Sequence, residues 1–220
     1  AHNKLTMKRY RDSQIRKVME NPAIEVRLNT RVDETVVNAV KPDVLIAAVG
    51  ALPITPPIPG ADGENVIFGA DLMADTPLGQ NVVVIGGGMI GCEESIYLTD
   101  LGHRVTIVEL QDDIAADCLK YPFLWLHHEV ETRDIRVMTG SSCTSITENS
   151  VTVKNLKTGA EEVIPCDNVV LAAGTRARSD EVERLRPLVN SFYVVGDAKI
   201  AKNVMLAVRD GYDAVVDMGL

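Results

Sequence analysis

Three glycines in one short stretch carry the clearest chemical signal in the sequence. Gly86, Gly88 and Gly91 form the pattern G-x-G-x-x-G directly after the apolar run Val82–Ile85. In a strand–turn–helix unit the first glycine permits a tight turn, the second lets the backbone approach a pyrophosphate, and the third allows close helix packing. Amide groups at the helix N-terminus then favour the phosphate charge. The stretch therefore predicts a dinucleotide-binding loop.

The residues after the second glycine predict a helix that packs on the preceding strand. Met89 and Ile90 lie between the glycines of the motif, and we count both among the cofactor-binding positions of the loop. Apolar side chains recur to about Leu101, and Gly102 then ends the helix. This strand–turn–helix order is the context that the glycine pattern needs in order to indicate a nucleotide site.

An acidic residue closes the next predicted strand. Arg104–Val108 is a short run rich in β-branched residues, and Glu109 follows it, 23 positions after Gly86. Dinucleotide folds place an acid about 20 residues after the glycines, where its carboxylate accepts the ribose hydroxyls. The alternative is a glycine-rich turn without a ligand. The strand, glycines, helix, second strand and acid in register argue against it.

Composition bounds the class of protein. The chain has 220 residues and a formal net charge of −9, which argues against nucleic acid or an anionic membrane as a main partner. No apolar run approaches the roughly 20 residues of a membrane helix, and residues 1–20 lack a signal-peptide core. The four cysteines show no paired spacing, which favours buried cytosolic thiols over disulfides or a metal site. We therefore expect a soluble, cytoplasmic protein without a metal centre.

Hydrophobic periodicity predicts helices and strands along the rest of the chain. The expected helices are 4–20, 115–133 and 205–218, and the expected strands are 24–28, 43–50, 135–139, 167–174 and 192–197. Segments 145–146, 151–155 and 162–165 should form a small meander with a turn at 157–159, 32–40 a short helix or irregular connection, and the proline-rich 52–60 an extended linker. The side chains expected to face inward on the two terminal helices are Leu5, Ile15, Val18, Met19, Ala207, Val208, Val215 and Val216.

The adjacent His127 and His128 would point about 100° apart on a helix, which favours solvated residues over metal ligands.

Two segments of the chain repeat each other. Asp43–Gly50 and Asp167–Gly174 both consist of an acid, an apolar run, paired alanines and a glycine. The second copy lies 124 residues after the first, so a glycine motif serving the first copy would fall before residue 1. We therefore expect a fragment of a longer chain, in which the phosphate-binding half of a first dinucleotide-binding domain is missing.

This arrangement resembles the flavoproteins built like glutathione reductase, in which a nicotinamide domain is inserted into an FAD-type domain. Within them it is most similar to the C-terminal portion of the Old Yellow Enzyme-like fused reductases, the group of the 2,4-dienoyl-CoA and 2-enoate reductases and trimethylamine dehydrogenase. The segments that carry the resemblance are 24–32, 42–53, 56–62, 79–110, 166–174, 192–199 and 207–214.

The resemblance implies an α/β fold: a Rossmann-like, three-layer NAD(H) domain with a small β-meander, inserted into a truncated FAD-type domain. Residues 76–189 would form the NAD(H) domain, and residues 1–75 and 190–220 would form the FAD-type remainder. The implied function is that of an NADH:flavin oxidoreductase. NADH binds, and in the intact enzyme a hydride passes to FAD for onward electron transfer. The partner would be an FMN/iron–sulfur barrel domain of the same parent chain, and the isolated chain would be inactive.

The resemblance also assigns roles at the nicotinamide domain. The three glycines of the motif and Glu109 would bind the adenosine diphosphate part of NAD(H). An acid at this position without an arginine directly after it favours NADH over NADPH. Gly174 would lie under the cofactor. Glu93 matches the family glutamate near the nicotinamide, although an acid favoured by the helix dipole in the first turn explains it equally well.

Three further positions would belong to the FAD site. Gly196 and Asp197 match the family motif in which the aspartate meets the flavin ribityl chain; the alternative is an ordinary helix cap. Gly50 closes Ala48-Val49-Gly50, where the family has Ala-Thr-Gly, so a hydroxyl near the adenine dinucleotide is absent. Without the first glycine motif, we expect the purified chain to be colourless or to hold flavin weakly.

Two other functions remain open. One is a non-catalytic module that holds an ADP-type ligand for structural reasons, as in an amine dehydrogenase-like flavoprotein. The other is an ordinary Rossmann dehydrogenase, which lacks support because no Ser/Tyr/Lys or His/Asp constellation is present. No residue needs to be catalytic, because the cofactors carry the chemistry. The sequence also leaves open whether strands orphaned by truncation pair internally, disorder, or join a second copy in a homo-oligomer.

Overall fold

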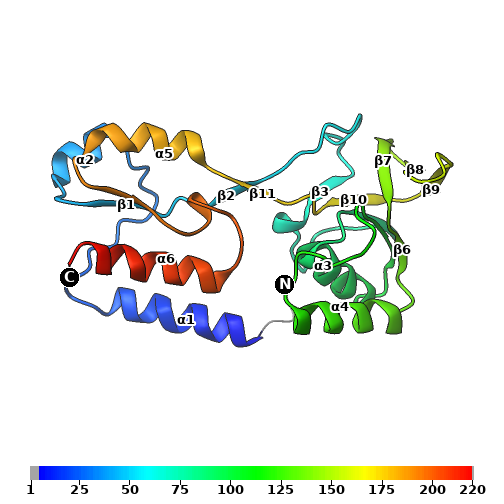
Figure 1. The fold of residues 1–220 in the computed structure, drawn as a ribbon, viewed down its shortest axis with the longest axis horizontal. Helices are drawn as coiled ribbons and strands as arrows, with labels where there is room; N and C mark the ends of the chain where they lie inside the picture. The colour runs from blue at the N-terminus through cyan, green and yellow to red at the C-terminus, as the bar shows by residue number, and fades with distance from the viewer. Residues whose placement is uncertain (1–4, 220) are drawn as a thin grey trace. The chain divides into compact units, whose positions relative to one another are not determined.

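The computed structural model describes residues 5–219. These residues divide into two compact units, which are described separately (Figure 1). The first unit is Pro53–Gly174, and the second unit comprises Thr6–Leu52 and the chain from Thr175 onwards.

A five-stranded parallel sheet forms the centre of the first unit. Its strands in spatial order are β3 (Val66–Phe68), β10 (Asn168–Leu171), β4 (Asn81–Ile85), β5 (Arg104–Val108) and β6 (Arg136–Met138). Val82, Val83 and Val84 in β4 are at most 1% exposed. A continuous apolar strand of this kind is expected where both faces of a parallel sheet are covered.

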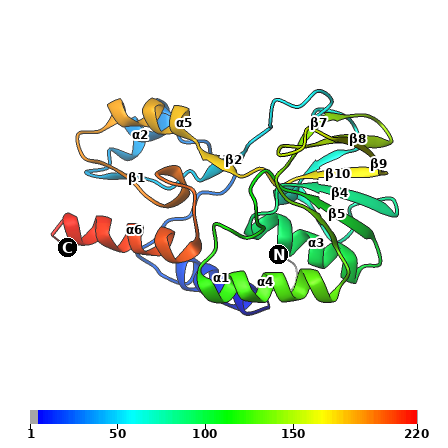
Figure 2. The same ribbon diagram turned by 45° about the vertical axis from the view of Figure 1, so that its right-hand side comes forward.

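Different layers cover the two faces of this sheet (Figure 2). Helices α3 (Met89–Asp100) and α4 (Lys120–Thr132) pack on one face, with Ile96, Leu98 and Leu126 in the shared core. An antiparallel meander packs on the other face, and its strands are β7 (Ser141–Ile146), β8 (Ser150–Asn155) and β9 (Glu161–Pro165). The 3₁₀ turn η1 (Gly69–Asp71) follows β3. The α/β class with a Rossmann-like parallel sheet is therefore confirmed.

The second unit contains two short sheets and four helices. Strands β1 (Leu45–Ala47) and β12 (Phe192–Val194) pair in parallel, and β2 (Ala51–Pro53) pairs with β11 (Thr175–Ala177). The helices are α1 (Leu5–Met19), α2 (Glu34–Val40), α5 (Ser179–Leu185) and α6 (Val204–Asp217), with 3₁₀ turns η2 (Arg186–Leu188) and η3 (Gly196–Ala198). Side-chain caps start two of them: Asp33 accepts from the amide of Val36, and Asn203 from the amide of Leu206, both at 3.0 Å.

Several expectations for the second unit were wrong. Residues 24–28 form no strand, because in the described part of the chain no strand lies beside them to accept their backbone hydrogen bonds. The expected strand at 43–50 exists as β1 but is not buried throughout, since Ile46 is 43% exposed. Helices α1 and α6 form where expected, yet most of their supposed inward side chains are exposed. These side chains are Ile15, Val18, Met19, Val208, Val215 and Val216. The side chain of Leu5 and the structure of residue 4 lie outside the described part.

One helix of the first unit begins later than expected. The helix predicted for 115–133 starts at Lys120, because Ala115 has a φ of +52° and donates its amide to the carbonyl oxygen of Gly87 at 2.7 Å. Residues 110–119 therefore form a loop that lies against the glycine motif. In the described residues, no helix is both long and apolar enough to cross a membrane.

Candidate functional site

The glycine motif forms the turn between β4 and α3, as its spacing predicts. Gly86 has a φ of +105°, and a Cβ atom there would lie 2.5 Å from the carbonyl oxygen of Ala172 in the neighbouring chain segment. A Cβ atom at Gly91 would overlap the carbonyl oxygen of Gly86. Gly86 and Gly91 are therefore required by the fold itself, whether or not a ligand binds.

Gly88 differs from its two neighbours in the motif. It precedes α3 with a φ of −67°, a conformation open to any residue, and its amide lies at the positive end of the helix dipole. The atom nearest to a Cβ placed there is a carboxylate oxygen of Asp117, at 3.5 Å. Packing does not require glycine at this position. The space beside Gly88 is instead what a phosphate group approaching the backbone would need.

Glu109 lies beside this turn at the carboxyl end of β5. Its side chain is buried, with 7% of its surface exposed, and its carboxylate accepts hydrogen bonds from the amides of Gly87 and of Gln111, the latter at 2.7 Å. Two amide donors hold the acid against the loop in a fixed orientation. Its position at the end of the second strand is the one where dinucleotide folds carry the acid that accepts the ribose hydroxyls.

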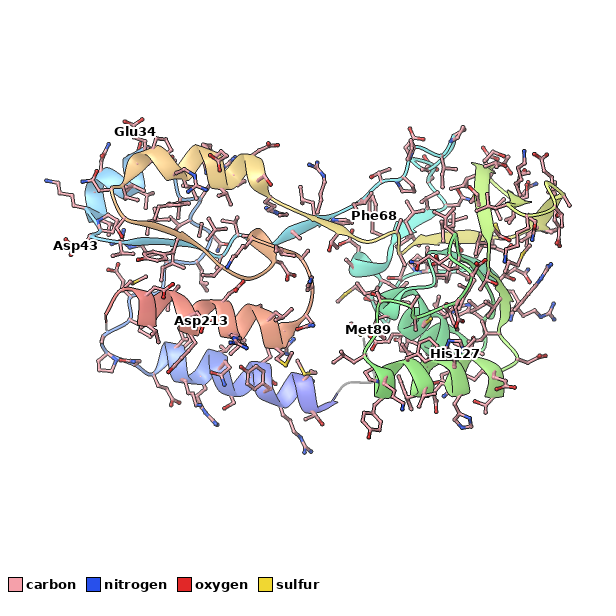
Figure 3. All side chains as sticks on the ribbon, in the orientation of Figure 1. Glu34, Asp43, Phe68, Met89, His127 and Asp213 are labelled. Atoms are coloured by element: carbon pink, nitrogen blue, oxygen red, sulfur yellow. The ribbon has the colours of Figure 1, made fainter. Side chains whose placement is uncertain are left out.

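The first turn of α3 presents side chains of different kinds. Met89 packs against the helical core, whereas Ile90 is 43% exposed at the start of the helix. Glu93 is buried, at 8% exposure. Figure 3 shows Met89 and His127 on the helical side of the first unit. The sequence grouped Met89 and Ile90 together as cofactor-binding positions, but the exposed Ile90 is the one that a ligand over the loop could contact.

Cys92 makes two hydrogen bonds to the backbone of the same turn. Its amide donates to the carbonyl oxygen of Gly88 at 3.0 Å, and its thiol donates to that of Gly87 at 3.2 Å. Burial raises the pKa of the Cys92 thiol to about 12, so the thiol stays protonated and donating at neutral pH. This contact was not predictable from the sequence, because a single cysteine in a helix has many possible roles.

Gly174 follows the strand next to the glycine motif. Strand β10 runs parallel to β4, and beyond its end the amide of Ala172 donates to the carbonyl oxygen of Ile85 at 2.8 Å. Gly174 has a φ of +92°, and its carbonyl oxygen accepts from the amide of Ile54 at 3.0 Å. It therefore lies at the same sheet edge as the motif.

The second unit brings the residues predicted for the FAD site to one sheet edge. Gly50 and Gly196 follow the paired strands β1 and β12, with φ angles of +75° and +62°. The amide of Gly196 donates to Asp210 at 3.2 Å, and the carboxylate of Asp197 accepts from the amide of Lys202 at 3.4 Å. Asp197 thus holds the loop that leads into α6. Asp197 lies within η3 and does not cap a long helix.

A groove of about 490 Å³ in the second unit was not foreseen from the sequence. It is lined by Thr30, Arg31, Val32, Val49, Arg178, Glu181, Arg184 and Leu185. The Glu181 carboxylate pairs with Arg184 and with Arg31, both at 2.7 Å, and these cations hold its pKa below the ordinary value, the hydrogen bond from Arg184 contributing most. Arg31 and Glu181 are 150 positions apart, so only the fold reveals the groove.

The described histidines and cysteines lie apart from one another as far as metal binding is concerned. Among the described residues, no three His, Cys, Asp or Glu side chains are grouped so that they could hold an ion. His127 is instead half-buried, and its Nε2 lies 3.2 Å from the carbonyl oxygen of Ile114 and 3.1 Å from a carboxylate oxygen of Asp113. His128 is exposed. His127 therefore contributes to holding the loop before α4 and is not simply solvated.

Comparison with protein families gives one match over most of the chain. The model described as "Pyridine nucleotide-disulphide oxidoreductase" matches residues 4–208. Among curated proteins, the chain is 33% identical over 197 residues to a bilirubin reductase of Mediterraneibacter gnavus, covering 88% of this chain and 30% of that protein. It is 34% identical over 200 residues to an NADH oxidase of Thermoanaerobacter brockii, covering 88% of this chain and 31% of that protein.

Solved structures give the same result. The fold superposes on a 2-naphthoyl-CoA reductase in complex with 2-naphthoyl-CoA with a TM-score of 0.83 and 29% sequence identity, covering 94% of this chain and 31% of that chain. The chain thus spans about a third of the length of these three proteins.

Proposed function

Because the chain belongs to the pyridine nucleotide-disulphide oxidoreductase family, we propose that it supplies the NADH-binding unit of an NADH:flavin oxidoreductase. Members of this family bind FAD and NAD(P)H. The observation that carries the proposal is the Glu109 carboxylate held by two amides beside the turn of Gly86 and Gly88. That arrangement pairs a ribose acceptor with a phosphate-binding turn.

The residues present fit the ADP part of a dinucleotide. Gly88 leaves its side of the turn open, and the N-terminus of α3, which begins there, favours a phosphate charge. When bound, the nicotinamide would supply hydride transfer, and the chain would bind and orient it. Ile90 would contact the ligand through its exposed side chain, and Gly174 would border the site from β10. Glu93 would lie toward the nicotinamide.

The charge around Glu109 supports NADH over NADPH. A 2′-phosphate would meet the carboxylate directly, and the loop that follows adds Asp112 and Asp113. Arg104 starts β5 and Glu109 follows its end, so the strand separates the guanidinium from the ribose site. We expect discrimination against NADPH to come from this acidic edge.

The finer assignment to the Old Yellow Enzyme-like fused reductases is part of the proposal. In it, residues 76–189 form the NAD(H) domain, and residues 1–75 and 190–220 contribute to an FAD-type domain. Strands β1 and β12 form a parallel sheet of only two strands. Such a small sheet is unusual in a folded domain, because parallel sheets are normally buried on both faces. We expect a further segment of the parent protein to complete this sheet. A barrel domain with FMN and an iron–sulfur centre would receive the electrons.

The groove of the second unit favours one alternative function. Arg178 has no ion pair among the described residues, and together with Arg31 and Arg184 it gives the groove a cationic wall beside Val49. Such a wall suits the phosphates of an ADP-type ligand held for structural reasons. In this alternative no hydride is transferred, and the nicotinamide adds nothing to affinity.

Calorimetric titration of the chain with NADH, ADP and NADPH tests the proposal. We expect NADH to bind more tightly than ADP, and NADPH to bind most weakly. Glu109→Gln should reduce the preference for NADH over NADPH, whereas Glu148→Gln, which makes the same charge change at an exposed turn of the first unit, should not. Equal affinities for NADH and ADP would favour the structural ADP site. Absence of binding by every nucleotide would overturn both functions.

A second measurement separates the two functions in another way. The chain is mixed anaerobically with FAD and NADH, and the loss of flavin absorbance is followed. Reduction faster than in a protein-free mixture supports the oxidoreductase function, and reduction at the protein-free rate supports the structural function.

A further inference from the structure

The meander covers only part of one face of the five-stranded sheet. Parallel register places side chains of neighbouring strands in rows across that face. The row of Ile85, Val108 and Met138 lies nearest the carboxyl ends of the strands and packs in the core shared with the meander. The rows nearer the amino ends are only partly covered. This leaves an open groove at the edge opposite the glycine motif.

The groove combines polar and apolar surfaces. Its volume is about 510 Å³, within the range of small-molecule sites. Its apolar lining residues are Val82, Val83, Val105, Ile135 and Pro165, and of these only Pro165 is exposed. The polar residues Asn81 and Arg104 pair across β4 and β5, and Thr106 pairs with Arg136 across β5 and β6. The hydroxyl of the half-buried Thr106 makes no hydrogen bond within the described residues.

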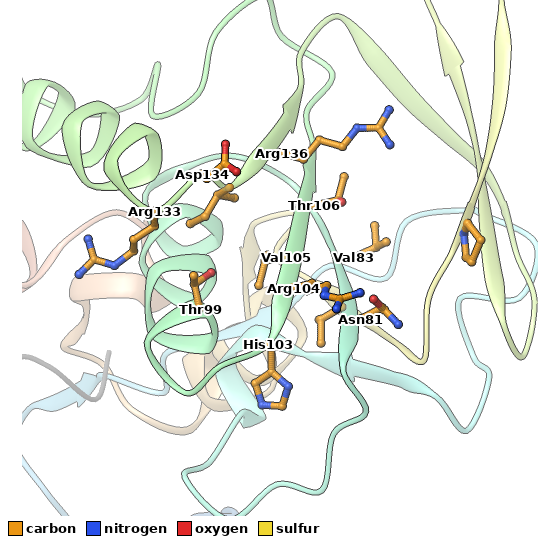
Figure 4. Close-up of a pocket in the computed structure, with 13 residues that line it drawn as sticks. Asn81, Val83, Thr99, His103, Arg104, Val105, Thr106, Arg133, Asp134 and Arg136 are labelled. Carbon is orange, nitrogen blue, oxygen red and sulfur yellow. The ribbon is translucent and has the colours of Figure 1, made fainter.

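One guanidinium in this groove has no partner. Arg104 is exposed, and its side chain makes no ion pair or hydrogen bond in the part of the chain that the structure describes. Arg136 donates to both carboxylate oxygens of Glu162, each at 2.8 Å. Figure 4 shows the side chains of Arg104, from β5, and Arg136, from β6, on the same side of β5, with Asp134 on the other side.

Of the other ionisable groups of the groove, Arg133 and His103 are engaged elsewhere, whereas the Asp134 carboxylate makes no ion pair or hydrogen bond among the described residues. Arg133 pairs with Asp100 at 2.7 Å and with Glu129 at 2.6 Å, and these contacts raise its pKa, the hydrogen bond from Asp100 contributing most. His103 Nδ1 lies 2.8 Å from the carbonyl oxygen of Gly79. Arg104 is therefore the group able to receive an anion without breaking an existing contact.

We propose that this groove is a second ligand site, which binds a small organic carboxylate through Arg104 and Thr106. The guanidinium would donate to the carboxylate in its forked geometry, and the Thr106 hydroxyl would donate to one oxygen. The apolar body of the ligand would lie against the exposed ring of Pro165. A single free guanidinium suits one carboxylate better than a phosphate, which carries more charge and would also face the Glu162 carboxylate. The site lies at the amino edge of the sheet, so it leaves the dinucleotide loop free.

Benzoate is a suitable probe, and amide chemical shifts of the full 220-residue chain are a suitable readout. We expect saturable binding with a dissociation constant on the order of millimolar. The amides of Arg104 and Thr106 should shift and that of Gly88 should not, both with and without saturating NADH. Benzamide, which has the same shape without the charge, should bind much more weakly.

Three variants test the role of the charges. Arg104→Gln should weaken benzoate binding about tenfold. Glu162→Gln should strengthen it severalfold, because it releases the Arg136 guanidinium into the groove. Lys120→Gln removes a charge from an exposed position of the same unit and should change nothing. An unchanged affinity in Arg104→Gln, a weaker affinity in Glu162→Gln, tighter binding of inorganic phosphate than of benzoate, or shifts centred on Gly88 would each overturn the proposal.

Discussion

The carboxylate of Glu109 accepts a hydrogen bond from the amide of Gly87 and so joins the end of β5 to the turn after β4. The same carboxylate accepts from the amide of Gln111. One side chain therefore fixes both the phosphate-binding turn and the loop before α4. The acid that dinucleotide folds use to bind the ribose therefore also stabilises the turn and the loop when no ligand is bound.

Replacing Glu109 should affect both stability and binding. Glu109→Ala leaves two amide donors without their acceptor, and we expect it to lower the free energy of unfolding by about 1–3 kcal/mol. Glu109→Gln keeps one acceptor oxygen and should have a smaller effect. Urea denaturation followed by Trp125 fluorescence reports on the first unit, since this is the one tryptophan of the chain. Equal stability of Glu109→Ala and the parent chain would contradict this stabilising role.

Two glycines of the motif should respond differently to alanine. Gly91→Ala places a methyl group on the carbonyl oxygen of Gly86, so we expect the first unit to lose much of its stability. Gly88→Ala has room for its methyl group and a favourable φ, so it should fold normally while binding NADH about tenfold or more weakly. Unfolding curves and calorimetric titration of both variants check this. Normal NADH affinity in Gly88→Ala would show that the ligand does not approach that glycine.

Asp117 gives a third prediction about the same loop. Its carboxylate borders the space beside Gly88, where it would repel the phosphates of a nucleotide. Asp117→Asn should therefore strengthen NADH binding by roughly two- to fivefold, an effect that added salt diminishes. The matched control is Asp75→Asn, at an exposed turn of the same unit. A loss of affinity in Asp117→Asn would mean that Asp117 supports the loop and does not oppose the ligand.

Buried thiols should make the protein less stable in alkali. Burial raises the pKa of Cys92 to about 12 and the pKa of Cys143 and of Cys166 to about 11, whereas the ordinary value is 9.0. Above about pH 9 the unfolded chain loses protons that the native state keeps, so the free energy of unfolding falls as pH rises toward 11.

Urea midpoints measured from about pH 8 to about pH 10.5 test the effect of these thiols. Other groups also titrate in this window, so the comparison is between the parent chain and Cys166→Ala. The variant should show a shallower decline with pH, even if its stability at pH 8 is lower. A parallel decline in both chains would contradict the prediction.

The sequence predicted the region around the glycine motif closely because its signals are local. Strands β4 and β5, helix α3 and the position of Glu109 follow from apolar runs and glycines that are neighbours in the chain. The meander was also predicted, since alternating residues and a turn at Gly159 mark it. The repeat of Asp43–Gly50 and Asp167–Gly174 corresponds to the strands β1 and β10.

Features that depend on distant contacts were not predictable in the same way. The late start of α4 results from Ala115 bonding to Gly87, 28 positions earlier. Likewise, the β-branched residues at 24–28 favour a strand, but a strand needs a neighbour that local sequence cannot supply. The exposed faces of α1 and α6 show the same limit: periodicity identifies an apolar stripe such as Val208 and Val215 without showing what covers it.

The position of β10 between β3 and β4 has a consequence for how the protein is made. This strand lies inside the sheet, yet it leaves the ribosome after every other strand of the first unit. Until Asn168–Leu171 emerges, β3 has no hydrogen-bonding neighbour in its sheet, and one side of β4 stays bare. Closing the sheet requires contacts between residues that are far apart in the chain, which slows folding. The first unit should therefore acquire protease resistance abruptly and late during synthesis, when this strand inserts.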